Sequence, residues 1–161
     1  MIKEEIRHTE QGDIIASSPA LSGVDTLLTE TSKEYRLKEA MELIKDLYDY
    51  VIIDTPPALG ILTINALTAC SGIIIPAGAD IYSLQGISQL KGIIETVKKY
   101  CNNSLEILGI LLTRYNSRVV IGREVAQMLE KTAKRLNTKP YNTKTRECIT
   151  IKEAQSMRES I

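Results

Sequence analysis

The sequence predicts an α/β fold with a mainly parallel β-sheet and helices on both faces of the sheet. Apolar runs of strand length alternate with segments in which apolar residues recur at helical spacing. This alternation is typical of parallel strands joined by crossover helices. The chain has 161 residues, without an internal repeat or a flexible linker. Residues 1–161 are therefore predicted to form one domain with a substantial core.

The first predicted helix precedes the first predicted strand. Thr31 and Glu34 have the spacing of a capping box, and apolar residues over 37–47 then fall on one helical face. Residues 50–53 form a continuous apolar run that is rich in β-branched side chains. Such a run predicts a strand that is buried on both faces, and the prolines just after it predict its end.

The rest of the chain continues the alternation of helices and strands. The predicted elements are a helix over 60–69, a strand over 72–77, a helix over 83–101, a strand over 105–113, a helix over 121–136 and a short terminal helix over 151–161. Ser83 is the predicted N-cap of the longest helix. Because helices separate the strands, we expect the strands to be parallel.

Composition excludes several classes of protein. The apolar runs are far shorter than the ~20 residues that a membrane-spanning helix requires, so no membrane contact is expected. The first residues do not have the pattern of a secretory signal, and a cytoplasmic location is predicted. Cys70, Cys101 and Cys148 are widely separated and odd in number. They predict reduced thiols rather than a disulfide framework or a zinc site.

Charge is divided unevenly along the chain although the net charge is zero. Residues 1–87 carry 13 acidic and 6 basic side chains, whereas residues 88–161 carry 7 acidic and 14 basic ones. An ordinary solvated surface mixes both signs more evenly. The basic half therefore predicts a surface that meets a polyanion, with a merely solvated basic surface as the alternative.

Polar residues at the ends of the predicted strands are the first candidates for a functional site, because ligands of open α/β sheets bind there. Asp54 ends the apolar run 50–53. A carboxylate in that position can orient water on a phosphate-bound Mg²⁺. An aspartate that ends a strand is also a common turn former, so the pattern alone leaves both interpretations open.

A longer stretch around Asp54 resembles the Walker B and switch II segment of the ParA/Soj family of partition ATPases. Residues 49–67 read DYVIIDTPPALGILTINAL. The resemblance continues in register through residues 75–76, 82–86, 111–118 and 152–156, and residues 12–17 resemble the family's segment ahead of this region. It covers nearly the whole chain and implies a P-loop NTPase fold.

The resemblance implies ATP and Mg²⁺ as cofactors of the intact family. Asp54 matches the Walker B aspartate, which acts on the metal through a water molecule. The switch residues that match are Thr55, Pro56 and Pro57, and Arg146 aligns loosely with residues that approach the adenine. We expect these residues to form the nucleotide site as far as this chain contains it.

The sequence departs from the family in one essential part. It contains no KGGxGK[ST] loop, and its glycines are scattered singly. In the family that loop follows the first strand and cradles the phosphates, so the chain is expected to be an N-terminally shortened member without ATPase activity of its own. Three origins are consistent with the missing loop: an expression fragment, a gene remnant and a natural regulator. The missing strand would leave residues 50–53 with an open edge, which predicts self-association.

The basic half is expected to bind DNA without sequence preference, as the family does. Arg118 matches an arginine that is implicated in DNA binding in the family, and Arg114 and Arg123 are further candidates. The resemblance also implies a ParB-like partner, a homo-oligomer and association with the nucleoid. Two alternatives are a non-catalytic DNA-binding or partner-binding module, and a relative of MinD or of tyrosine kinases with the same fold.

Overall fold

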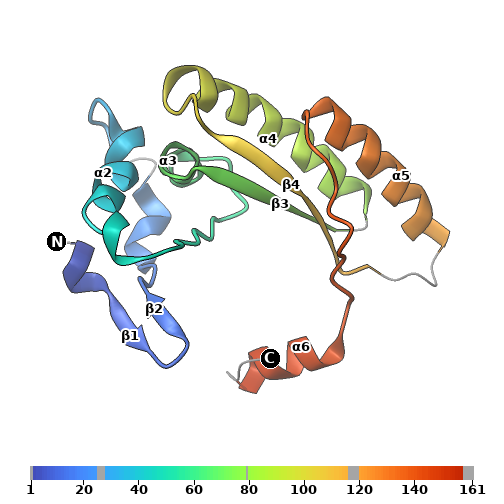
Figure 1. The fold of residues 1–161 in the computed structure, drawn as a ribbon, viewed down its shortest axis with the longest axis horizontal. Helices are drawn as coiled ribbons and strands as arrows, with labels where there is room; N and C mark the ends of the chain where they lie inside the picture. Colours follow the sequence, from blue (N-terminus) through green and yellow to red (C-terminus); the bar gives the residue numbers. More distant parts are fainter. Residues whose placement is uncertain (1, 25–27, 79, 116–119, 158–161) are drawn as a thin grey trace. The chain divides into compact units, whose positions relative to one another are not determined.

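The computed structural model describes residues 2–24, 28–78, 80–115 and 120–157 (Figure 1). The chain is divided into two compact units. The first unit consists of residues Met1–Ser71 and Ile93–Leu105, and the second of residues Gly72–Gly92 and Glu106–Ile161. That residues 1–161 form one domain stays a prediction.

The first unit contains a small hairpin and several short helices. Its elements are η1 (Ile2–Glu5), β1 (Arg7–Thr9), β2 (Gly12–Ile14), η2 (Pro19–Gly23), η3 (Lys33–Tyr35), α2 (Arg36–Glu42), η4 (Lys45–Leu47) and α3 (Ile61–Ala69). β1 and β2 are antiparallel. Asp13 accepts hydrogen bonds from Tyr48 at 2.5 Å and from His8 at 2.7 Å. The bond from Tyr48 ties the hairpin to the segment that precedes residues 50–53, and the bond from His8 joins the two strands of the hairpin.

α3 is the central helix of the first unit and is buried on most of its surface. The amide group of Asn65 on this helix is buried and fully bonded. Its nitrogen donates to the carbonyls of Lys33 and Ile61, each at 3.0 Å, and its oxygen accepts from the Leu37 N–H at 3.0 Å. One side chain therefore joins α3 to η3 and α2, because it satisfies backbone groups on both.

The second unit is built on two parallel strands. Its elements are β3 (Gly72–Gly78), β4 (Glu106–Thr113), α5 (Val120–Arg135), α6 (Ile149–Met157) and the first part of α4 (Ile81–Tyr100). β3 pairs with β4 from Gly72↔Glu106 to Gly78↔Thr113. The buried residues are aliphatic: Ile75, Ala77, Ile87, Ile110, Leu112, Leu129, Ala133 and Leu136. They come from both strands and both long helices, as expected for helices packed on a sheet.

Residues 139–146 run parallel to β4 on the side away from β3, as an irregular third strand. Bridges join Ile110 to Pro140 and Tyr115 to Arg146. Between them, the Thr145 N–H donates to the Leu112 carbonyl at 3.0 Å. The sequence gives no strand signal here, because the segment contains a proline and alternating polar residues instead of an apolar run. Backbone hydrogen bonds to β4 hold it in place.

The prediction of a buried strand at residues 50–53 is wrong for this chain. The segment is irregular and belongs to no strand of the described residues. Tyr50 is 89% exposed and Ile52 is 93% exposed. A β-strand needs neighbouring strands to satisfy its N–H and C=O groups, and the described residues provide none beside this run.

Two predicted helix boundaries also need correction. The helix predicted over 37–47 is α2, which begins at Arg36 and ends at Glu42. A 3₁₀ turn precedes it, so the predicted capping box lies ahead of the helix. The longest helix begins at Ile81, before Ser83. Asp80 caps it by accepting hydrogen bonds from the Ser83 N–H at 2.8 Å and the Ser83 hydroxyl at 2.9 Å.

The other predicted elements are confirmed. The helix predicted over 60–69 is α3, the strands over 72–77 and 105–113 are β3 and β4, and the helix over 121–136 is α5. The terminal helix is α6, which begins two residues earlier than predicted. Among the described residues, no helix has an apolar stretch long enough to cross a membrane.

Replacement of Asn65 tests whether its buried amide holds the first unit together. Asn65→Ala leaves the Leu37 N–H and the Lys33 carbonyl without this partner, which we expect to lower the free energy of unfolding by about 2 kcal/mol. Urea denaturation followed by circular dichroism measures the change. Asn103→Ala, at an exposed turn, is the matched control and should change stability little. Equal losses for the two variants would contradict the structural role of Asn65.

Candidate functional site

The carboxyl ends of β3 and β4 meet at one edge of the sheet in the second unit. Gly78 and Thr113 are opposite each other in the last pair of the ladder. Asp80 follows β3, and Arg114 follows β4 directly. The parallel pairing thus brings together two segments that are more than thirty residues apart, at the edge where ligands of such sheets bind.

Asp80 is an anchoring group at this edge. Its carboxylate accepts the two hydrogen bonds from Ser83, and these hold the pKa of Asp80 below its usual value. The Arg114 guanidinium lies 3.8 Å from the same carboxylate. A Cβ atom on Gly78 would lie only 2.5 Å from the Asp80 Oδ2 atom, so the carboxylate lies tightly against the end of β3. Asp80 is therefore engaged in capping α4.

Arg114 occupies a left-handed backbone conformation, with φ of 52°. Only a small fraction of non-glycine residues adopt it, and its effect here is to turn the chain sharply after β4. The side chain is 70% exposed despite the contact with Asp80. A cationic group is thus presented to solvent at the end of the strand.

Two further cationic residues lie at this edge. The irregular strand brings Lys144 and Arg146 beside the end of β4, where the Tyr115 N–H donates to the Thr145 carbonyl at 2.9 Å. The Lys144 ammonium lies 4.5 Å from the centre of the Tyr115 ring. Both cationic side chains are exposed. We call Arg114, Lys144 and Arg146 the cationic edge.

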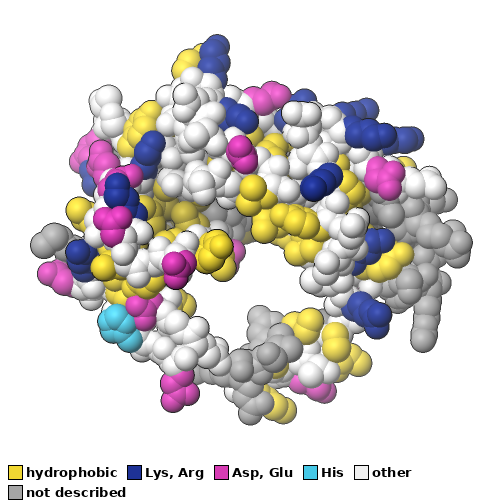
Figure 2. Space-filling model, in the orientation of Figure 1, with side chains coloured by type: hydrophobic (Ala, Val, Ile, Leu, Met, Phe, Trp, Pro, Cys, Tyr) yellow, Lys and Arg dark blue, Asp and Glu magenta, His cyan; other side chains and the backbone are white. Residues whose placement is uncertain are grey.

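The cationic edge belongs to the more basic of the two units. The first unit carries 8 basic and 13 acidic side chains, and the second carries 12 basic and 7 acidic ones. On the face drawn in Figure 2, acidic side chains are frequent over the first unit, around the hairpin and α2. The charge division of the sequence therefore follows the division into units.

The residues predicted for nucleotide binding are distributed over both units. Asp54, Thr55, Pro56 and Pro57 lie in the first unit, exposed and outside its helices and strands. Arg146 lies in the second, paired with Tyr115. The described residues contain no cluster of three or more metal-binding side chains. A role for Asp54 on a phosphate-bound Mg²⁺, through a water molecule, stays a prediction.

The structure describes the three residues predicted for DNA binding to different extents. Arg114 is placed at the cationic edge. Arg118 lies outside the described residues, and the side chain of Arg123 on α5 does too. Sequence reasoning missed Lys144 as a member of this edge, because its segment carries no strand pattern. The basic composition of residues 114–146 was the signal that could have included it.

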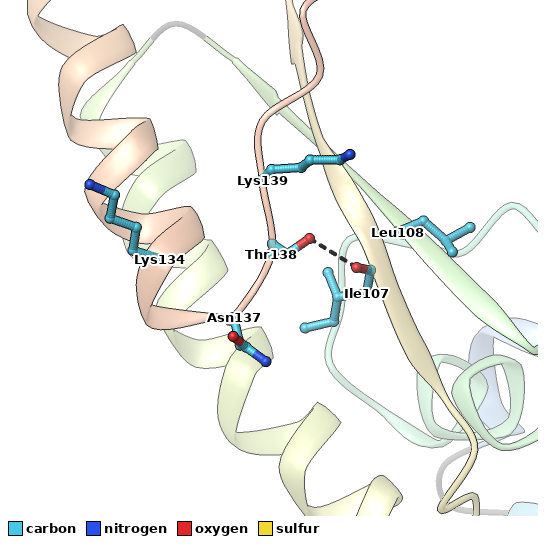
Figure 3. Close-up of a pocket in the computed structure, with 6 residues that line it drawn as sticks. All are labelled: Ile107, Leu108, Lys134, Asn137, Thr138 and Lys139. Atoms are coloured by element: carbon cyan, nitrogen blue, oxygen red, sulfur yellow. Dashed lines mark hydrogen bonds between the residues drawn. The ribbon is translucent and has the colours of Figure 1, made fainter.

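A pocket of about 450 Å³ lies at the opposite, amino end of β4 (Figure 3). Its lining residues are Ile107, Leu108, Lys134, Asn137, Thr138 and Lys139. The Thr138 hydroxyl is engaged, since it donates to the Ile107 carbonyl at 2.9 Å. Lys134 and Lys139 point away from each other, so the pocket has no convergent charged groups that would hold an anion.

Comparison with known proteins identifies the family. Residues 1–107 match the family described as AAA domain. The sporulation initiation inhibitor protein Soj of Bacillus subtilis is 41% identical over 148 residues, which is 91% of this chain and 57% of that protein. The chromosome partitioning protein ParA of Myxococcus xanthus is 39% identical over 124 residues, or 76% of this chain and 43% of that protein.

Solved structures agree with these relatives. Cobyrinic acid a,c-diamide synthase from Mycobacterium smegmatis, with bound ADP and magnesium, has a TM-score of 0.75 and 32% identity, covering 80% of this chain and 54% of that one. The predicted P-loop NTPase fold is confirmed. The chain spans about half the length of the curated relatives it matches. It belongs to the AAA-domain family and is a homologue of the Soj and ParA proteins.

Proposed function

We propose that this chain is the DNA-facing part of a ParA-type partition ATPase, acting in chromosome or plasmid segregation. The observation that carries the proposal is the cationic edge, in a chain whose relatives include proteins named for chromosome partitioning. Its partners are duplex DNA of any sequence and a ParB-like protein, and it associates with the nucleoid.

DNA binding follows from the charge of the second unit. Exposed Lys and Arg side chains neutralise phosphates and release counterions, which gives affinity without base recognition. The cationic edge supplies three such side chains at one end of the sheet. Arg118 and Arg123 extend the same interface in this proposal, on the grounds of their sequence positions.

The nucleotide-dependent part of the function needs more than this chain contains. Asp54 would orient the water on Mg²⁺, residues 55–57 would respond to the γ-phosphate, and Arg146 would lie near the adenine. All of this depends on phosphates cradled by backbone amides and lysine, and no glycine-rich loop of that kind occurs in the sequence. By itself the chain is therefore proposed to hold ATP and Mg²⁺ weakly and to hydrolyse none.

A non-catalytic DNA-binding or partner-binding module is the second candidate. The exposed, unpaired position of residues 50–54 favours it, because a catalytic carboxylate needs a rigid support. DNA binding is common to both candidates. They differ in whether Asp54 takes part in nucleotide turnover when a glycine-rich loop holds the phosphates.

Nonspecific DNA binding is tested by fluorescence anisotropy with a short duplex of arbitrary sequence across a salt titration. We expect binding that weakens steeply with salt, and Arg118→Ala should reduce the log–log slope by about 1 because one phosphate contact is lost. Arg36→Ala in the acidic first unit removes the same charge and should leave the slope unchanged. A slope that is unaffected by Arg118→Ala would remove this arginine from the interface.

ATP turnover tests whether the chain by itself holds a working nucleotide site. The isolated chain should release inorganic phosphate from ATP and Mg²⁺ only at background rate, and Asp54→Ala should leave that rate unchanged, since nothing positions the phosphates. A sensitive phosphate-release assay of both proteins measures this. A rate above background that Asp54→Ala abolishes would mean that the chain holds a working nucleotide site.

Self-association is expected from the exposed run at residues 50–53. Unpaired, apolar extended segments pair with strands of other chains, and a charge within the segment opposes such pairing. Ile52→Lys should therefore shift the nucleotide-free protein toward monomer in analytical ultracentrifugation. Met128→Lys, which places the same charge on an exposed position of α5, is the control. A wild-type chain that is monomeric at every concentration would exclude the idea.

A further inference from the structure

The strand register places three side chains of the second unit on one face. Tyr115 and Arg146 are bridge partners in parallel pairing, so their side chains point to the same side. Lys144 is two residues before Arg146 in extended backbone, and alternation puts it on that side too. The contact between the Lys144 ammonium and the Tyr115 ring, at 4.5 Å, agrees with this register.

The Tyr115 ring restricts where the Lys144 charge lies. A lysine ammonium on a flexible four-carbon stem is normally spread over many positions. Attraction to the face of an aromatic ring favours the position over that ring, and the ring belongs to a residue that backbone bonds fix at the end of β4. The ammonium is thereby held at the edge where Arg114 also presents its charge.

We propose that Lys144 contacts the phosphate backbone of duplex DNA at the cationic edge, and that Tyr115 is a positioning residue that holds its ammonium there. The inference rests on the proposed DNA-binding function and adds a contact that the sequence did not indicate. Phosphate is the fitting partner because the side chains of the cationic edge are all cations, and contacts with phosphates do not depend on the base sequence.

A nucleotide carries phosphates as well, so ATP is the competing source of the same chemistry. Arg146 was predicted near an adenine, and it lies on the face that carries Lys144. DNA and ATP predict different effects of the variants. A DNA contact changes the salt dependence of duplex binding, whereas a nucleotide contact changes the affinity for a fluorescent ATP analogue.

The test measures duplex binding of the full chain across a salt titration for Lys144→Ala, Lys144→Gln, Tyr115→Phe and Tyr115→Leu. Both lysine variants should reduce the log–log slope by about 1. Tyr115→Phe keeps the ring and should behave as wild type, while Tyr115→Leu should weaken binding without removing the charge. Lys99→Ala is the matched control, because Lys99 lies 4.8 Å from the Tyr100 ring in the first unit and its loss should change nothing.

Three results would overturn the inference. If Arg118→Ala weakens duplex binding and the Lys144 variants do not, the proposed function stands and the Lys144 contact is wrong. If the wild-type chain binds no duplex even at low salt, the proposed function fails and the inference with it. If the Lys144 variants weaken binding of the ATP analogue and leave duplex binding unchanged, the site belongs to the nucleotide. Circular dichroism of each variant shows that it is folded.

Discussion

A β-strand is held in place by the hydrogen bonds of its neighbours, and this constraint governs the second unit. Among the described residues, β4 has neighbours on both sides, β3 on one and residues 139–146 on the other. Both neighbours are parallel to it, so their carboxyl ends arrive at one edge. The positions of Asp80, Arg114 and Arg146 at that edge follow from the ladder, and the apolar run at 50–53 shows the opposite case of a segment without partners.

Charged residues have two different roles at the carboxyl ends of β3 and β4. Asp80 is bonded to Ser83 and caps α4, so its charge stabilises the start of a helix. The cationic side chains around it remain exposed. Arg114 gains one long contact with Asp80, which neutralises little of its charge at an exposed position. A helix cap and a group of exposed cations therefore lie at the same end of the sheet.

Helices and strands with a clear pattern of apolar residues were predictable from the sequence. Elements whose structure depends on hydrogen bonds to distant parts of the chain were not. α3, β3, β4 and α5 follow from runs of apolar residues. Residues 50–53 have the same pattern but no partner strand, and residues 139–146 have the partner without the pattern. The edge carrying Arg114 was predictable from strand ends, whereas the Lys144–Tyr115 contact depends on a register that no local pattern encodes.

The two halves of the proposed function differ in how much structure they require. Phosphoryl transfer needs phosphates, metal and water fixed within a fraction of an ångström, so a single exposed carboxylate such as Asp54 achieves little without a phosphate cradle. Nonspecific DNA binding needs only exposed cations of sufficient density, because its free energy comes from released counterions. The second unit carries 12 basic side chains against 7 acidic ones. DNA binding is therefore the part of the proposed function that we expect this chain to perform alone.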